Sequence, residues 1–377
     1  MNYELTDEQE LLRRTVREFA ETKVAPVAEE LDRQERFPYE LVQEMAELGL
    51  MGIPIGEEYG GAGADTVSYA IAIEELTRID SSVAITVAAH TSLGTTPIYL
   101  YGSDEQKRAW VPQLASGARL AAFGLTEASA GSDAGATRTR AELRDGQWVI
   151  NGSKIFITNA GTDITACVTI TALTGDDEIS NIIVPNGTTG YEISAPMKKL
   201  GWHASDTREL SFKDCAVPEG NLLGPRGKGF HQFMQILDGG RISVASMGVG
   251  LAQGAYDLAF AYAKERQQFG RPIAKFQAVQ FALADMATEI EAGRQLVYRA
   301  AWLKDQGKDF ALAAAQAKLY TGLLSNRAVN AALQIHGGYG FMEEYAISRL
   351  YRDQKILEIG EGTNEVQRMV IAKLLGI

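Results

Sequence analysis

The sequence is poor in the residues that build disulfide scaffolds and metal centres. Its 377 residues include two cysteines, Cys167 and Cys215, and four histidines scattered along the chain. The cysteines form no CxxC pair, so a disulfide framework is not indicated, and we expect a reducing, cytoplasmic location. The wide spacing of cysteine and histidine also predicts that no metal is bound.

The sequence also lacks long apolar runs and any excess of positive charge. No stretch of about 18 apolar residues occurs, and the start of the chain shows no basic segment followed by an apolar one. We therefore expect neither a signal peptide nor membrane insertion. A formal net charge of −12 argues against nucleic acid or an anionic membrane surface as the main partner.

Several common nucleotide and metal motifs are missing as well. The sequence contains no GxGxxG, no Walker A motif and no HExxH. The nearest approach is Gly248-Val-Gly250-Leu-Ala-Gln-Gly254, which lies inside a helical pattern. We predict that these glycines serve close helix packing.

What is present is the composition of an ordinary globular protein, with 46% hydrophobic and 22% charged residues. Helical periodicity covers residues 1–118, and short β-rich runs separated by Asp-Gly and Asn-Gly turns cover 119–225. Long Ala- and Leu-rich helical runs fill 226–377. The predicted fold is α+β and mostly α, with an N-terminal α-helical domain, a middle β-barrel or sandwich domain and a C-terminal four-helix bundle.

Local signals place individual elements. Thr6 with Gln9 and Ser103 with Gln106 are expected to cap helices. The clearest predicted strands and helices are then 148–150, 155–158, 166–172 and 181–184 in the middle domain, 66–78 and 82–93 before it, and 238–268, 275–306, 309–335 and a last helix after Thr363 beyond it.

The stretch around Glu361 is the most informative for chemistry. Glu361 lies between Gly360 and Gly362, and Thr363 or Asn364 can cap the helix that follows. Unpaired N–H groups at a helix start can hold a carbonyl oxygen or a phosphate beside the carboxylate. A surface glutamate in a glycine turn is the alternative reading of this stretch taken alone.

Two segments of the middle domain could line a ligand. Residues 123–135 offer hydroxyls at Thr126 and Ser132 and small residues that expose main-chain N–H groups, which suits a flat heterocycle or a phosphorylated chain, but equally a simple polar loop. Phe156 and Thr158 fall on one face of a strand, where cross-strand packing is the alternative.

Three motifs together resemble the acyl-CoA dehydrogenases. They are Gly-Leu-Thr-Glu-x-x-Ala-Gly-Ser-Asp at 124–133, Gln-x-x-Gly-Gly-x-Gly-Phe at 334–341 continuing to Glu344, Arg349 and Asp353, and Glu-Gly-Thr at 361–363. The similarity spans almost the whole chain, in the family's order of helical, β and helical regions.

The resemblance implies that FAD binds between the β domain and the C-terminal bundle. Thr126 would border the flavin pyrimidine edge, Thr158 would donate to flavin N5, and Phe156 would flank the ring where many relatives carry Trp. Arg266 would hold the pyrophosphate of FAD in a neighbouring subunit, which implies a homotetramer built as a dimer of dimers. The full set of implied cofactor residues is Phe123, Leu125, Thr126, Ser132, Phe156, Ile157, Thr158, Arg266, Phe269, Gln277, Gln334, Gly337, Gly338, Thr363, Asn364 and Glu365.

For the acyl-CoA substrate, the resemblance implies that Ser132, Asp238 and Arg241 contact the pantetheine arm and that Gly362 lies against the thioester. Glu361 would be the catalytic base. Two positions of this sequence depart from the family's pattern. Gly360 stands where many relatives have Tyr, and Gly240 stands where some branched-chain and long-chain members carry their base.

The implied activity is FAD-dependent α,β-dehydrogenation of short-chain acyl-CoA thioesters to 2-enoyl-CoA, with electrons passed to an electron-transfer flavoprotein. Other activities stay open at this point. They are a short branched-chain acyl-CoA dehydrogenase, an acyl-CoA oxidase or flavin monooxygenase on the same scaffold, and a non-catalytic CoA-binding protein.

Overall fold

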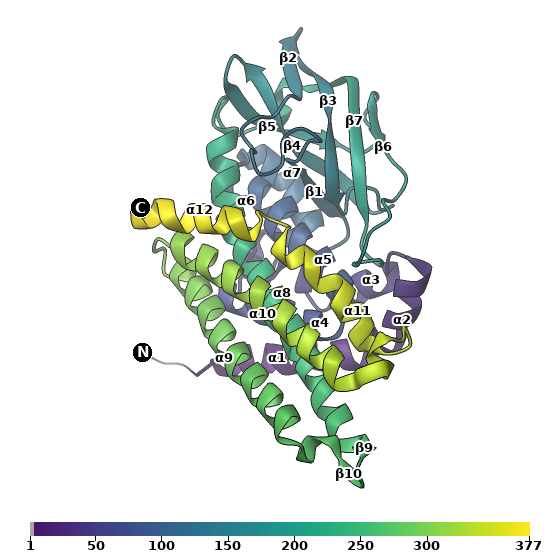
Figure 1. Ribbon diagram of the computed structural model, residues 1–377. Coiled ribbons are helices and arrows are strands. Elements are labelled where there is room, and N and C mark those ends of the chain that lie inside the picture. The colour runs from purple at the N-terminus through teal and green to yellow at the C-terminus, as the bar shows by residue number, and fades with distance from the viewer. Residues whose placement is uncertain (1–3) are drawn as a thin grey trace.

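The computed structural model describes residues 4–377, and it shows a body of helices with a sheet at one end (Figure 1). The two predicted capping boxes are confirmed, since the Thr6 and Ser103 side chains accept from the backbone of Gln9 and Gln106. The N-terminal helices are α1 (Asp7–Phe19), α2 (Ala25–Gln34), α3 (Tyr39–Glu47), α4 (Thr66–Ile79), α5 (Ser81–Ala88), α6 (Thr96–Tyr101) and α7 (Asp104–Ala115).

The helix predicted over 82–93 is interrupted. Helix α5 ends at Ala88, and a π-helical segment, η4 (Ala89–Thr95), follows it. His90 in this segment accepts from the Ala121 backbone N–H at 3.1 Å through Nδ1, and its Nε2 lies 2.9 Å from the Leu114 carbonyl oxygen. Through these bonds η4 contacts both α7 and the start of β1. The helical periodicity of the sequence did not predict this connection.

The middle region is one open sheet, so the barrel alternative is wrong. The strands are β1 (Leu120–Gly124), β2 (Arg140–Arg144), β3 (Gln147–Thr158), β4 (Thr165–Gly175), β5 (Glu178–Pro185), β6 (Tyr191–Ile193), β7 (Thr207–Pro218) and β8 (Leu222–Leu223). Their order is β6-β7-β3-β2-β4-β5-β8, with β1 parallel to β4. Strands β2 and β4 pair only at Arg140 and Leu173, so the two halves diverge at this point instead of closing.

The two halves of the sheet enclose a common core. Trp148 and Phe212 from one half pack in the same buried cluster as Ile170 and Ile182 from the other. This is a sandwich-like arrangement within one sheet, consistent with the second predicted form of the middle domain.

The C-terminal region contains the long helices expected there. They are α8 (Gly229–Glu265), α9 (Gln277–Asp305), α10 (Ala311–His336), α11 (Ala346–Asp353) and α12 (Asn364–Leu375). Helix α8 begins at Gly229 instead of Asp238, which extends it back to the sheet, where the Asn181 amide donates to the Gly229 carbonyl at 3.2 Å. A short β9–β10 hairpin (Gln267–Gln268 and Arg271–Pro272) separates α8 from α9.

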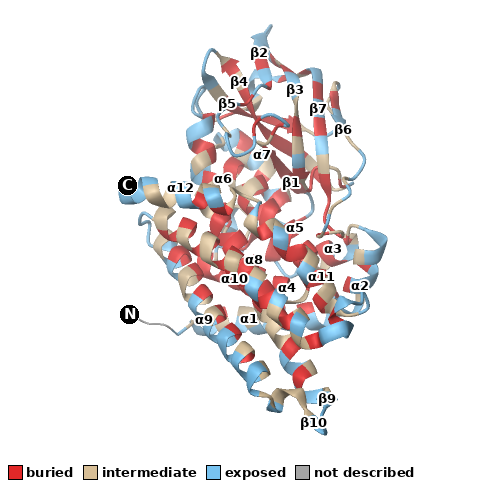
Figure 2. Cartoon of the chain, in the orientation of Figure 1, coloured by how far each residue is buried: buried red, intermediate tan, exposed pale blue. Residues whose placement is uncertain are grey.

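Helix α8 packs tightly between α4 and α10, and its glycines make this possible. A Cβ at Gly248 would lie 2.8 Å from Thr321 Cβ on α10, and Cβ atoms at Gly250 and Gly254 would overlap backbone oxygens of α4. The predicted packing role of these glycines is therefore confirmed. The resulting hydrophobic core runs through the N-terminal and C-terminal helices, which share buried residues along α4, α8 and α10 (Figure 2).

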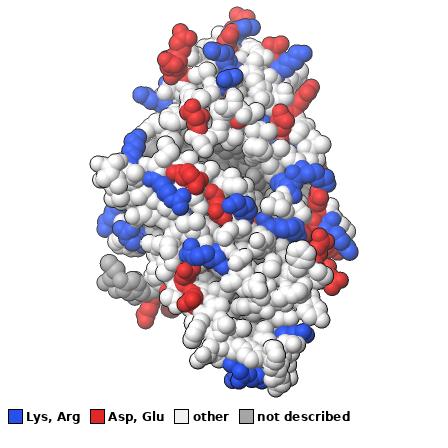
Figure 3. All heavy atoms as spheres, in the orientation of Figure 1, with Lys and Arg blue, Asp and Glu red and all other residues white. Residues whose placement is uncertain are grey.

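The described surface mixes charges of both signs. On the face seen in Figure 3, Lys and Arg side chains are interspersed with Asp and Glu side chains. Within residues 4–377, no helix has both the length and the apolar character needed to cross a bilayer.

We predict that Gly250→Ala destabilises the fold. The added methyl would overlap the Glu74 carbonyl oxygen, and overpacking of this kind costs about 1–3 kcal/mol. Urea denaturation should show a lower midpoint than that of Gly220→Ala, a control position where no atom lies within 4 Å of the added Cβ. Equal midpoints for the two variants would contradict the packing role.

Candidate functional site

The Glu361 turn is held by hydrogen bonds from two helices. Glu361 and Gly362 both have positive φ, at 50° and 89°. The Lys318 ammonium on α10 donates to the Gly362 carbonyl at 2.8 Å, and the Gln367 amide on α12 donates to the same oxygen at 2.9 Å. A left-handed conformation at a non-glycine residue is costly, and these contacts fix it in place.

The Glu361 carboxylate points at helix α8. Its Oε2 atom is buried and has no hydrogen-bond partner among the described residues. A Cβ built at Gly240 would overlap this same oxygen, so the absence of a side chain at Gly240 makes room for the carboxylate. Gly240, the position at which some relatives carry their base, therefore faces the Glu361 carboxylate directly.

This environment brings the pKa of Glu361 close to neutral pH. Burial raises the pKa of its carboxyl from 4.5 to about 7, against the opposing effect of the Lys318 and Arg241 cations. A carboxylate that lacks hydrogen bonds and titrates near neutrality can accept a proton from a ligand at physiological pH.

Lys318 is a functional candidate that sequence reasoning missed. Its side chain is fully buried on α10, and burial lowers the pKa of its ammonium to about 8. The available signal was a single lysine directly after the Ala-rich run 311–317, where a buried charge requires a partner. That partner, the Gly362 carbonyl, is more than forty residues away in sequence and is brought close only by the fold.

Asp238 and Arg241, both expected to contact substrate, form an ion pair on one face of α8. Arg241 is buried, and its Nε atom has no hydrogen-bond partner within residues 4–377. Burial raises the pKa of Asp238, partly offset by Arg241. The pair therefore places a second desolvated cation beside Glu361.

The loop over residues 125–135, which is predicted to border the flavin, follows β1. The end of β1 is held by a contact with α8. Phe123 is buried and stacks on Phe233 with ring centroids 5.3 Å apart, whereas Ser132 is exposed and Leu125 and Thr126 are half-buried. The Leu125 carbonyl oxygen accepts a hydrogen bond from the buried Lys154.

A buried ion pair supports this loop. The Lys154 ammonium donates to Glu127 Oε1 at 2.7 Å and to the Leu125 carbonyl at 3.1 Å. Glu127 also accepts from the Arg138 and Thr139 backbone N–H groups, at 2.7 and 3.0 Å. The hydrogen bonds of Glu127 and Lys154 therefore fix both ends of the loop, a role the sequence did not reveal.

Strand β3 presents Phe156 outward. The pairing of β3 with β7 shifts register between Lys154 and Ile157, and Phe156 takes a positive φ of 63°. Phe156 is 61% exposed, which is unusual for an aromatic residue in a strand, while Ile157 points into the sheet core. Thr158 is half-buried. An exposed ring beside a hydroxyl suits a flat ligand, whereas the Ile157 side chain is directed away from it.

The start of α12 borders the Glu361 turn. Thr363 caps the helix by accepting from the Val366 N–H at 3.2 Å. Asn364 is buried and Glu365 is exposed. The first-turn N–H groups of this helix can bind a phosphate or ribityl oxygen beside the base.

The remaining predicted cofactor residues form a separate group at the far end of α8 and α10. Arg266 lies over the Tyr339 ring at 5.4 Å, and His336 stacks on Tyr262, so the ends of the two helices are in contact. The β9–β10 hairpin lies at the end of the molecule opposite the sheet (Figure 1). The structure does not bring this second group to Glu361 within one chain. Arg266 is half-buried, and the exposed members of the group are Phe269, Gln277, Gln334, Gly337 and Gly338.

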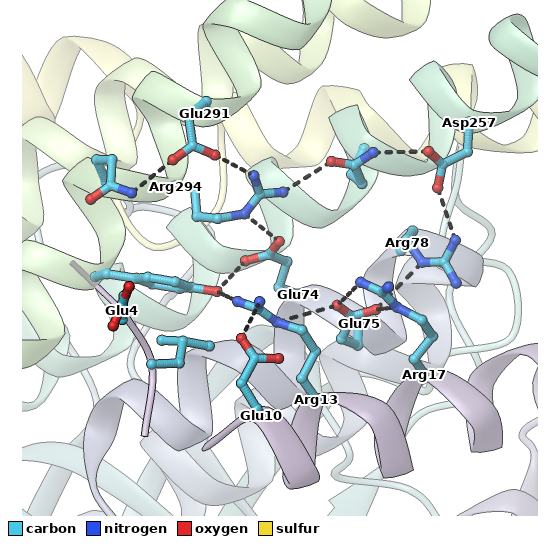
Figure 4. A pocket seen from close by; sticks show the side chains of 14 residues that line it. Glu4, Glu10, Arg13, Arg17, Glu74, Glu75, Arg78, Asp257, Glu291 and Arg294 are labelled. Carbon is cyan, nitrogen blue, oxygen red and sulfur yellow. Dashed lines mark hydrogen bonds and ion pairs between the residues drawn. The ribbon is translucent and has the colours of Figure 1, made fainter. Parts of the chain in front are cut away.

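A charged cavity of about 650 Å³ lies elsewhere, among α1, α4, α8 and α9 (Figure 4). Its acidic and basic side chains point toward one another. Glu75 pairs with Arg17 at 2.7 Å, and Arg294 pairs with Glu74 at 2.9 Å. These contacts join the first helix to the core, and the cavity is separate from the Glu361 site.

Comparison with known proteins identifies the family of the chain. Residues 6–118, 122–215 and 227–376 match the acyl-CoA dehydrogenase N-terminal, middle and C-terminal domains. The chain belongs to the acyl-CoA dehydrogenase family. The motif segments 124–133, 334–341 and 361–363 lie in the loop after β1, at the end of α10 and in the Glu361 turn.

Individual relatives cover the whole chain. A probable acyl-CoA dehydrogenase, YngJ, of Bacillus subtilis is 51% identical over 100% of both sequences. The structure of butyryl-CoA dehydrogenase from Megasphaera elsdenii is 43% identical and covers 100% of both chains at a TM-score of 0.97. A chain in a structure titled for the electron transferring flavoprotein of Acidaminococcus fermentans is 45% identical, with a TM-score of 0.98 over 100% of this chain and 99% of that one.

No group of three or more metal-ligating side chains occurs within residues 4–377. The polar atoms around Glu361 are a carboxylate, two cations and backbone groups. Such a set can move a proton and hold an organic ligand, as the family's chemistry requires.

We predict that Glu361 titrates with a midpoint near pH 7. Folding raises its pKa above 4.5, so its contribution to stability is full below about pH 4.5 and is lost as pH rises through about 7. Lys318→Met removes an opposing cation and should move the midpoint to higher pH. Isotope-edited infrared difference spectra, assigned by their loss in Glu361→Gln, measure the carboxylate fraction.

Lys198→Met is the control for that titration, because Lys198 is exposed and pairs with Glu35. A midpoint that stays in place in Lys318→Met would show that Lys318 does not act on the base.

Proposed function

We propose that this protein catalyses FAD-dependent α,β-dehydrogenation of short-chain acyl-CoA thioesters. The single observation that carries the proposal is the buried carboxylate of Glu361, which has an unpaired oxygen and a pKa of about 7. Membership of the acyl-CoA dehydrogenase family supports it, and the similarity to a butyryl-CoA dehydrogenase supports the short-chain assignment.

FAD is the cofactor of this family, and the residues present fit it. The exposed Phe156 ring and the hydroxyls of Thr126 and Thr158 match the flat polar ring system. At Gly131, Gly337 and Gly338 an added Cβ would meet no atom within 4 Å, so backbone there is open to a close ligand. Arg266 would hold the pyrophosphate, and Thr363 to Glu365 would contact the ribityl chain.

The chain's own residues perform the proton chemistry. Glu361 accepts the α proton of the thioester, and its backbone N–H would donate to the thioester oxygen, where negative charge develops. Lys318 and Gln367 hold the turn so that this N–H and the carboxylate keep their relative positions. Bound FAD supplies the acceptor for the β hydride.

The substrate arm would lie along α8. Asp238 and Arg241 are placed near Glu361 on the same helix, and Ser132 is exposed on the facing loop. Gly362 follows the base and would lie against the thioester. Without a side chain at Gly240, the carboxylate available to the thioester α-carbon is that of Glu361.

The assembly and electron acceptor are part of the same proposal. Because Arg266, Gln277, Gln334, Gly337 and Gly338 lie away from Glu361 within one chain, we propose that they reach the FAD of a neighbouring subunit in a homotetramer. The similarity to a chain in a structure titled for an electron transferring flavoprotein supports such a protein as the acceptor. Cys167 and Cys215 are buried and free, which supports the cytoplasmic location.

Replacing Glu361 with Gln should block the reaction while preserving the site. The amide keeps the size of the side chain but cannot accept the α proton, and loss of a positioned base costs about 10²- to 10⁴-fold in rate. After anaerobic mixing with butyryl-CoA, the variant should keep its oxidised flavin spectrum while the wild type bleaches.

Glu358→Gln is the matched control, since Glu358 lies one turn earlier and pairs with Lys355. Near-normal bleaching in Glu361→Gln would mean that another residue is the base.

Arg266→Ala should release FAD more readily. Loss of a charge-assisted bond to phosphate weakens affinity roughly 10- to 100-fold. The ratio of flavin to protein absorbance after gel filtration measures retention, and sedimentation velocity reports the assembly. Arg271→Ala, in the hairpin that follows Arg266 but with its guanidinium over the Phe276 ring, is the control. Unchanged retention in Arg266→Ala would refute the pyrophosphate contact.

A further inference from the structure

The peptide group that joins Leu125 to Thr126 has a different environment at each end. Its carbonyl oxygen, on Leu125, accepts a hydrogen bond from the buried Lys154 ammonium at 3.1 Å. Its N–H group, on Thr126, has no hydrogen-bond partner within residues 4–377, and the Thr126 hydroxyl has none there either. Because the peptide bond is trans and planar, its C=O and N–H bonds point in opposite directions. The Thr126 N–H is therefore directed away from Lys154 and is free to bind a ligand.

Lys154 is a buried cation held in one position. Its side chain is fully buried, and its ammonium contacts acceptors on several segments of the middle domain. Besides the Leu125 carbonyl, they are Glu127 Oε1 at 2.7 Å, Thr137 Oγ1 at 3.1 Å and Thr171 Oγ1 at 3.0 Å. Burial lowers the pKa of this ammonium to about 8, with Glu127 acting in the opposite direction. The group therefore carries its charge at neutral pH.

A cation at the carbonyl end of a peptide strengthens the N–H donor at the other end. Hydrogen bonds that share one group polarise one another, and this effect is larger where the local dielectric is low. Lys154 draws electron density toward the Leu125 carbonyl oxygen, which makes the Thr126 N–H a stronger donor. The Glu127 carboxylate has no bond to this peptide, because its other partners lie at 137–139. The charge of Lys154 therefore acts on one free N–H group.

This N–H group belongs to the residue expected to border the pyrimidine edge of the flavin. The Ile155 N–H donates to the Thr126 carbonyl at 2.8 Å, which joins the loop to β3 directly before the exposed Phe156. In the proposed reaction the hydride brings two electrons and one proton to the flavin, while the α proton goes to Glu361. One negative charge is thereby added to the flavin ring system. A strong donor at its pyrimidine edge stabilises that charge.

Resting on the proposed function, we propose that Lys154 is a positioning residue that raises the reduction potential of bound FAD through the peptide between Leu125 and Thr126. The polarised Thr126 N–H binds reduced FAD more tightly than oxidised FAD, so Lys154 favours electron uptake from the thioester. A lysine that only held the loop in place would strengthen the binding of both forms equally and would leave the potential unchanged. The ratio of the two affinities therefore separates the two roles.

The test measures FAD affinity and reduction potential in two variants, by equilibration with reference dyes in the absence of acyl-CoA. Lys154→Met removes the cation. The double variant Lys154→Met with Glu127→Gln also removes the carboxylate that would otherwise stay buried without its partner, a strongly destabilising situation. In both variants the affinity for reduced FAD relative to oxidised FAD should fall roughly tenfold, the loss of a hydrogen bond to a charged group. For a two-electron couple this corresponds to a potential about 30 mV lower.

Thr171→Val is the matched control, because it removes one acceptor of the same ammonium but keeps the charge and the bond to Leu125. Its potential should equal that of the wild type. An unchanged potential in the double variant, with or without weaker binding of both FAD forms, would mean that Lys154 only supports the loop. That result, or a fall in Thr171→Val as large as in Lys154→Met, overturns the proposal. Failure of the dehydrogenase proposal appears separately, as wild-type flavin that butyryl-CoA does not bleach.

Discussion

The burial of one carboxylate without a hydrogen-bond partner is the constraint on which this site depends. Glu361 Oε2 is removed from solvent, and desolvation raises the pKa of the group to about 7. Such a group costs free energy, and it persists only where the surrounding structure holds it in place. Lys318 and Gln367 supply that support through the Gly362 carbonyl, and Gly240 supplies the space. Stability is lost here in exchange for a base that is ready at neutral pH.

Helix α8 connects this constraint to the rest of the molecule. Its N-terminal half carries Asp238, Gly240 and Arg241 beside the base, and its middle glycines let α4 and α10 approach closely. The same helix begins against the sheet at Asn181 and ends near the Arg266 group. A shift of α8 would therefore disturb the base, the hydrophobic core and the expected cofactor contacts together.

The sheet contributes rigidity to a loop that must face a ligand. Polar loops are mobile unless their backbone groups are satisfied, and here Glu127 and Lys154 satisfy them from within the sheet. The exposed Phe156 ring is positioned by a register shift in β3.

The sequence by itself determined the order of helical, β and helical regions, the capping boxes and the glycine packing of α8, because periodicity, caps and motifs are local. It also singled out Glu361 as the candidate base. Only the tertiary structure decided that the sheet stays open, since this depends on the single pairing between Arg140 and Leu173. It also decided the role of Lys318. The Ala-rich run before Lys318 is a local sign that this lysine is buried, but its partner, the Gly362 carbonyl, lies on a segment that meets α10 only when the chain has folded.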